Sequence, residues 1–184
     1  MINVLKTRAA WPEGSANCSE AVKAIGQYLY THFRSHRLVA GNDPRLAAMP
    51  WRDAGVPPRF GALKRANPQR PASPACIAET GAVVTWTGRA NPAVNNLLPE
   101  HHMVLVDAAD LVATMEAAWE RINRDMEKHG RPRGINFIAG PSSTADIEGQ
   151  LVYGAHGPRQ WHVMLLGNVP QGALERARSA LAMR

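Results

Sequence analysis

Cysteine is scarce in this chain of 184 residues, which contains two, Cys18 and Cys76. They lie far apart, and neither belongs to a CxxC pair or to a string of cysteine and histidine ligands. Because an iron–sulfur cluster is usually held by four thiolates, the chain cannot bind one with its own cysteines. We therefore expect two reduced thiols, no metal site, and no cofactor bound by this chain itself.

Long apolar runs are missing as well. No run approaches the roughly 18 consecutive apolar residues that span a bilayer, and the first residues lack the apolar core of a signal peptide. The apolar share of 45% and the charged share of 20% are typical of soluble globular proteins. We expect a cytoplasmic protein that does not insert into membranes and that forms one domain.

Acidic residues are few only in the first part of the chain. Residues 1–75 carry eleven lysines and arginines against four acids, whereas residues 76–184 carry ten against eleven. A basic excess of this kind could attract an acidic partner, an anionic ligand or nucleic acid. No nucleic-acid motif or aromatic-interleaved basic stripe accompanies the charge, so we expect no nucleic-acid partner. A solvated basic surface is the simpler explanation.

The amino-terminal part, residues 1–74, is expected to hold one helix and an irregular segment within the same domain as the rest. Apolar residues at spacings of three and four predict a helix over 19–36. A short strand is expected at 38–41. The segment 42–74 is rich in proline and glycine, which predicts loop with one or two short extended pieces.

Residues 75–184 alternate apolar runs with helical patterns and are expected to form the α/β core. Four apolar runs are typical of buried strands: 82–87, 103–106, 135–139 and 161–166. Helices are expected over 110–128 and from Pro170 onward. The alternation predicts an α/β fold in three layers, with a mostly parallel sheet flanked by helices.

The segment 140–161, GPSSTADIEGQLVYGAHGPRQW, lies between two of these strands. Ser143 and Asp146 fit a capping pattern, which predicts a crossover helix that begins at Ser143. The carboxyl ends of strands are also where open α/β sheets bind ligands, and free N–H groups at a helix start suit an anion. Asp146 in the first turn would repel a phosphate. The segment is therefore either a well-capped crossover helix or the wall of a ligand site.

Two further places carry side chains that could do chemistry. Glu79 precedes the strand 82–87 and could act as a nucleophile or general base, or it could be an exposed acid in a turn. His101 and His102 precede the strand 103–106. Adjacent strand residues point to opposite faces, so the pair is a poor metal chelate, although one of the two could line a pocket.

Three motifs resemble those of the lactate utilization protein C (LUD domain) family. They are Ile77–Gly81 (IAETG), Asn96–His102 (NLLPEHH), and Gly140–Glu148 followed by Gly154–Pro158. They occur in order over about residues 75–166, which makes the signal more specific than one short pattern. The resemblance implies a fold like that of the CoA-transferase, sugar-phosphate isomerase and formyltetrahydrofolate cyclo-ligase group. The family often has a basic residue where this chain has Ser143, and its loss here weakens the expectation that this side chain binds an anion.

The resemblance implies a role in oxidising L-lactate to pyruvate beside iron–sulfur partner subunits, with this chain as the component that carries no cluster. Two alternatives stay open: a stand-alone enzyme that binds a small molecule, nucleotide or CoA and uses Glu79, and a module whose basic part docks an acidic partner. By analogy with the CoA-transferase fold, Glu79 is the suspected catalytic residue.

The residues expected to bind a small anionic ligand are Thr80, Gly81, Asn96, His101, His102, Gly140, Ser142, Ser143, Thr144, Asp146, Glu148 and His156. We expect the segments around positions 79, 101 and 142 to meet along one rim of the sheet.

Overall fold

The computed structural model describes residues 18–41, 44–60, 75–88, 91–145 and 150–167. The helices are α1 (Cys18–Phe33), α2 (Pro44–Ala47), α3 (Val94–Leu97) and α4 (Met115–His129), with 3-10 turns η1 (Trp51–Ala54) and η2 (Ala108–Asp110). The strands are β1 (Val39–Ala40), β2 (Arg59–Phe60), β3 (Ala75–Ile77), β4 (Ala82–Thr87), β5 (His101–Asp107), β6 (Leu111–Val112), β7 (Gly134–Ile138), β8 (Ser143–Ala145), β9 (Leu151–Tyr153) and β10 (Gln160–Leu166). In the described residues no helix combines the length and the apolarity that crossing a membrane requires.

Parallel, antiparallel and mixed sheets occur together with helices, which confirms the α/β class and corrects the expected predominance of parallel pairing. β5 pairs with β10 in parallel, and so does β3 with β6, but β4 is antiparallel to both β3 and β7. The cause is the tight turn between β3 and β4, in which the Gly81 N–H donates to the Ile77 carbonyl at 2.8 Å. Gly81 has a φ of +68°, which favours glycine. A connection this short can join only antiparallel neighbours.

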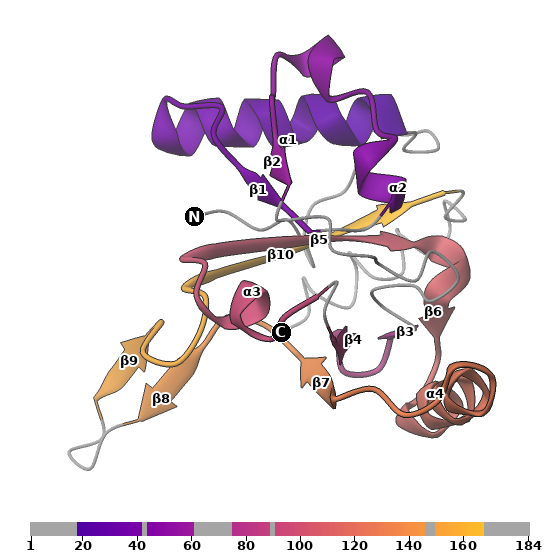
Figure 1. Ribbon diagram of the computed structural model, residues 1–184. Coiled ribbons are helices and arrows are strands. Elements are labelled where there is room, and N and C mark those ends of the chain that lie inside the picture. The colour runs from indigo at the N-terminus through magenta and orange to yellow at the C-terminus, as the bar shows by residue number, and fades with distance from the viewer. Residues whose placement is uncertain (1–17, 42–43, 61–74, 89–90, 146–149, 168–184) are drawn as a thin grey trace, which may run out of the picture.

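Two sheets lie between the helices (Figure 1). The parallel pair β5–β10 has α1 on one side, and the four-stranded sheet β6-β3-β4-β7 with α4 lies on the other side. β4 alternates between two buried clusters: Val83 packs with α1, β5 and β10, whereas Val84 packs with α4. The four-stranded sheet is therefore covered on both faces, as its continuously apolar run predicted.

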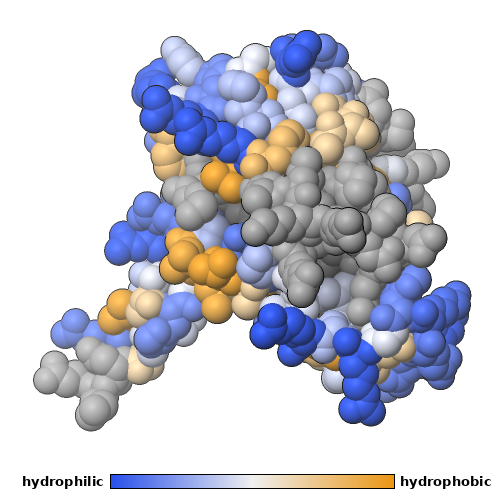
Figure 2. Space-filling view, viewed as in Figure 1, coloured by the Kyte–Doolittle hydropathy of each residue, from blue (hydrophilic) through white to orange (hydrophobic). Residues whose placement is uncertain are grey.

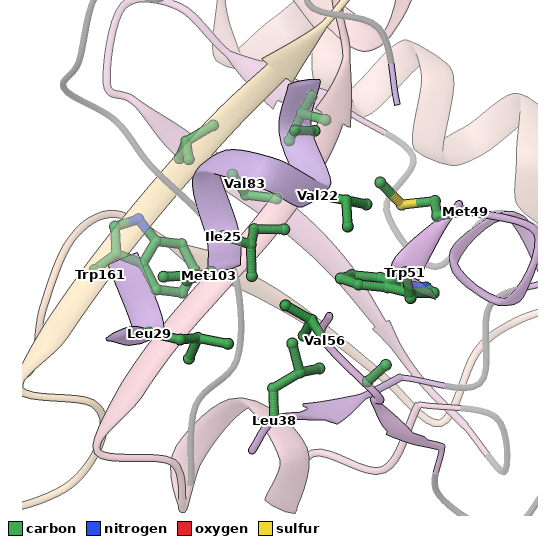
Figure 3. Packing of buried hydrophobic residues seen from close by; sticks show 14 of the residues in the cluster. Val22, Ile25, Leu29, Leu38, Met49, Trp51, Val56, Val83, Met103 and Trp161 are labelled. Atoms are coloured by element: carbon green, nitrogen blue, oxygen red, sulfur yellow. The ribbon is translucent and has the colours of Figure 1, made fainter. Parts of the chain in front are cut away.

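The first buried cluster joins α1 to residues 49–56, which lie in the segment that the sequence predicted to be loop. Figure 3 shows Ile25 of α1 packed near Trp51 of η1 and Val56. Gly26 permits this approach, because a Cβ at that position would stand 3.2 Å from a methyl group of Val56. The predicted helix at 19–36 and strand at 38–41 are confirmed in α1 and β1, while α2 and η1 are short helical turns that were not predicted.

Helix α4 begins five residues later than the predicted start at 110. The intervening residues form η2 and β6, and β6 pairs in parallel with β3. The Thr114 hydroxyl then caps the helix by accepting the Ala117 N–H at 3.3 Å. At the other end, Gly130 adopts a φ of +76°, which confirms the predicted stop.

The predicted crossover helix at Ser143 is wrong. Residues 143–145 form β8, which pairs antiparallel with β9, so that Ser143 lies opposite Tyr153. β9 contains valine and tyrosine, which favour strands. Only a few residues separate β8 from β9, so the two segments can pair as a hairpin. The hairpin projects from the body of the molecule (Figure 1). Residues 146–149 and the terminal helix expected from Pro170 lie outside the described residues.

Candidate functional site

β5 and β10 start together, and their starts form a rim that includes Ser142 and Pro158 of the third motif and the end of the second. His101 lies opposite Gln160 and His102 opposite Trp161. The Glu100 carbonyl accepts the N–H groups of Arg159 at 2.9 Å and Gln160 at 3.1 Å. We call residues 100–102, Ser142 and 158–162 the β5–β10 rim.

Ser142 is tied to this rim through its backbone. Its N–H donates to the Pro158 carbonyl at 2.8 Å, and its own carbonyl accepts the Gly154 N–H at 2.9 Å. Its hydroxyl accepts the His156 N–H at 3.4 Å. Ser142 and His156 are therefore linked through Pro158 and Arg159 to Glu100, which precedes the two histidines of β5. The predicted meeting of positions 79, 101 and 142 at one ligand site stays a prediction.

His101 faces α1 and shares a tyrosine with His162. The Tyr28 hydroxyl lies 3.1 Å from Nδ1 of His101 and 2.7 Å from Nε2 of His162. His32 stacks on Tyr28 with ring centroids 4.2 Å apart. A neutral imidazole pair satisfies this geometry: the hydroxyl donates to one ring and accepts an N–H from the other. We call Tyr28, His32, His101 and His162 the Tyr28 cluster.

Burial shifts the pKa values of two members of this cluster. It raises the pKa of Tyr28 above 10.0, so the phenol keeps its proton. Burial also lowers the pKa of His101 below 6.5; Glu100 opposes that shift and His32 adds to it. Burial therefore favours the neutral form of His101 and the protonated phenol of Tyr28, and both side chains are partly exposed.

His102 points the opposite way, into the interface between β5–β10 and the four-stranded sheet. It is 1% exposed and packs edge-on against Trp161, with ring centroids 4.8 Å apart. Burial lowers its pKa to about 4, with the Asn96 backbone opposing the shift. In the described part of the chain, no group lies at full hydrogen-bonding geometry to a ring nitrogen of His102 or to the indole nitrogen of Trp161, and the contact of His102 with the Asn96 backbone is weak. Unpaired buried polar atoms of this kind are rare in native proteins.

Asn96 anchors α3 to the four-stranded sheet. Its amide nitrogen donates to the Thr85 hydroxyl at 3.2 Å, and both residues are buried. Asn136 of β7 donates to Thr87 at 2.9 Å on the same side of β4. The sequence predicted Asn96 as a ligand residue but not its partner Thr85, although a threonine within an otherwise apolar strand was the available signal.

Glu79 caps a helix. Its Oε1 accepts the Met115 N–H at 2.8 Å, at the first residue of α4, and its own N–H donates to the Ala113 carbonyl at 3.2 Å. The side chain is exposed. Among the described residues no hydrogen bond or ion pair joins Glu79 to the β5–β10 rim. The turn that holds Glu79 is closed by Thr80, whose hydroxyl accepts the Ala82 N–H at 3.2 Å.

The other predicted ligand residues lie in and beside the projecting hairpin. Gly140 has a φ of +99°, Ser143 is exposed and Thr144 is half-buried. Asp146 and Glu148 lie outside the described residues. In the described residues no three histidine, cysteine or acidic side chains gather in a way that could hold a metal ion.

The fold and the rim together define a mixed α/β protein whose candidate site is the common start of two parallel strands. The sequence model of the LUD domain matches residues 73–166, a span that contains all three motifs. The chain belongs to the LUD domain family.

Curated relatives carry the name lactate utilization protein C. The protein from Exiguobacterium sp. is 31% identical over 140 residues, which is 71% of this chain and 61% of the relative. The protein from Macrococcus caseolyticus is 33% identical over 132 residues, 66% of this chain and 57% of the relative. The chain thus spans about three-fifths of the length of these relatives. A crystal structure of a DUF162 family protein from Deinococcus radiodurans aligns with a TM-score of 0.42 and 16% identity, covering 83% of this chain and 99% of that one.

Proposed function

We propose that this chain is the cluster-free component of a lactate utilization system that oxidises L-lactate to pyruvate. The observation that carries the proposal is the LUD match over residues 73–166, together with relatives named lactate utilization protein C. The names apply to those relatives, and we extend them to this chain because its three motifs fall inside the matched span.

The electron acceptor belongs to partner subunits in this proposal. Oxidation of L-lactate to pyruvate removes two electrons and two protons from the carbinol group. Cys76 is buried, which raises its pKa to about 11, and Cys18 lies exposed at the start of α1. Two such thiols cannot hold a cluster. Iron–sulfur subunits would therefore receive the electrons.

The Tyr28 cluster, in which α1 meets the β5–β10 rim, is the group best suited to a small 2-hydroxy acid. It is partly exposed. When the Tyr28 hydroxyl donates to Nδ1 of His101, the Nε2–H of His101 can donate to a carboxylate. In the other tautomer, Nε2 of His101 can accept the proton of a hydroxyl group. His102, by contrast, is enclosed.

Gene deletion followed by complementation tests the proposal. Loss of the gene should abolish growth on L-lactate and leave growth on pyruvate intact. A complementing Tyr28→Phe variant should restore less growth on L-lactate than Tyr30→Phe, a matched change on the exposed side of the same helix. Normal growth of the deletion strain on L-lactate would overturn the proposal.

The role of Glu79 distinguishes this proposal from the alternative in which the chain is an enzyme of the CoA-transferase type. Because its carboxylate caps α4, Glu79→Ala should lower the free energy of unfolding by about 1 kcal/mol, and Glu79→Gln, which keeps an acceptor oxygen, by less. Urea denaturation measures both. Growth on L-lactate should survive Glu79→Gln, whereas loss of growth with unchanged stability would favour the carboxylate as a catalytic group.

A further inference from the structure

Exposed hydrophobic side chains concentrate in two neighbouring segments. The described residues contain nine large hydrophobic residues with exposed side chains, and six of them lie in α3, at the residue that follows it, and in β9. The six are Val94 (46% exposed), Leu97 (55%), Leu98 (67%), Leu151 (59%), Val152 (44%) and Tyr153 (56%). We call the first three the α3 patch, and we call the hairpin of β8 and β9 the arm.

The arm and the α3 patch are joined through the backbone of the β5–β10 rim. Ser142, at the base of the arm, is bonded to Pro158, and Arg159 is bonded to Glu100, two residues after Leu98. Figure 1 shows α3 beside the base of the projecting arm, and Figure 2 shows hydrophobic side chains gathered where the arm leaves the body. The two apolar surfaces are therefore neighbours on the molecule.

The arm does not bury its own apolar residues. All three residues of β9 are exposed, and the arm contains only two short strands. A two-stranded hairpin is at best marginally stable alone in water, and its free edges invite pairing with another chain. An exposed apolar patch beside it marks a contact surface.

We propose that a second copy of this chain covers this surface, with the arm of each copy packed on the α3 patch of the other. One chain supplies both halves of the contact, and reciprocal contacts of this kind close around a two-fold axis, the commonest symmetry of soluble oligomers. At about 100 Å² of exposed surface for each of the six side chains, the dimer buries roughly 1,200 Å², which reaches the range of specific interfaces. Tyr153 is the aromatic anchor of each half.

The experiment measures the mass of the full chain by sedimentation and native mass spectrometry at micromolar concentration. The wild-type chain should be a dimer. An arm variant, Leu151→Glu with Tyr153→Glu, and a patch variant, Leu97→Glu with Leu98→Glu, should each be monomeric. Trp119→Glu, a matched change at an exposed aromatic residue on α4, should stay dimeric. Circular dichroism checks that each variant keeps its fold.

Mixing the arm variant with the patch variant tests the reciprocal arrangement. The mixture should form heterodimers, because one intact arm meets one intact patch, although neither variant pairs with itself. A monomeric wild-type chain would overturn the proposal, including the case in which the same surface binds an iron–sulfur subunit instead. Arm and patch variants that dimerise like the wild type would overturn it as well.

Discussion

Neighbouring histidines on the two faces of the β5–β10 pair differ in burial and in hydrogen-bond partners. On the face toward α1, His101 and His162 both lie within hydrogen-bonding distance of Tyr28. On the face toward the four-stranded sheet, His102 lies against Trp161, and no group in the described residues lies at full hydrogen-bonding geometry to its ring nitrogens. A histidine near solvent can be paired by one tyrosine, whereas a histidine between two sheets stays neutral because burial opposes its charge.

Truncating the aromatic residue on the enclosed face gives the largest expected difference between the two faces. Trp161→Ala should lower the free energy of unfolding by about 3–5 kcal/mol, because the residue is 7% exposed and belongs to the main buried cluster. Phe33→Ala, on the α1 face, should cost much less, because Phe33 is 36% exposed. Urea denaturation measures both, and equal losses would remove the contrast in burial.

The pH dependence of stability gives the next largest expected difference between the two faces. The pKa of His102 is lowered from 6.5 to about 4, so the unfolded chain gains a proton there before the folded chain does. Stability is therefore retained above pH 6.5 and lost as the pH falls toward 4, by at most about 1.4 kcal/mol per pH unit.

The variant His102→Phe should flatten this pH dependence of the free energy of unfolding. His101→Phe is the matched control and should flatten it less, because His101 is only partly buried. Unfolding curves at several pH values measure the slopes. Identical slopes in the wild type and in His102→Phe would contradict the enclosed, neutral histidine.

Removing one hydroxyl from the α1 face should have a smaller effect. Tyr28→Phe keeps the ring contacts and loses both contacts of the hydroxyl with His101 and His162, which should cost about 0.5–1.5 kcal/mol. Tyr30→Phe, on the exposed side of α1, should change stability little. The histidine resonances in NMR titrations should shift only in the first variant. Unchanged titrations would show that the hydroxyl is not shared.

Thiol labelling gives the smallest structural disturbance. Cys76 lies in the same buried cluster as Trp161, and burial raises its pKa to about 11, so it should resist alkylation at pH 8. Cys18 is exposed and should react at once. Mass spectrometry should count one label on the native chain and two in urea, and Cys18→Ser should remove the fast one. Rapid labelling of both thiols would mean that solvent reaches the buried cluster around Cys76.

Local patterns predicted several elements correctly. The four apolar runs are strands β4, β5, β7 and β10 to within two residues, because continuous apolar sequence is stable only between covering layers. The opposite orientation of His101 and His102 followed from strand geometry alone. The division of the chain at residue 74 stays a prediction.

Other features depended on which residues pair with one another in the folded chain. The capping pattern at Ser143 predicted a helix, but pairing with β9 made the segment a strand. Glu79 could have been a catalytic acid or an exposed acid in a turn; its contact with Met115, at the start of α4, makes it a cap. Tyr28 carried no motif, yet it bridges two histidines from separate strands.

The sequence by itself determined the family, the α/β class and the residues that alternate between the faces of each strand, because apolar periodicity and short motifs are local properties. Only the tertiary structure decided which polar groups meet. The side chains at positions 28, 101 and 162 come together because α1 packs across two parallel strands, and a hydrogen bond requires atoms within about 3 Å of each other, however far apart they stand in the chain.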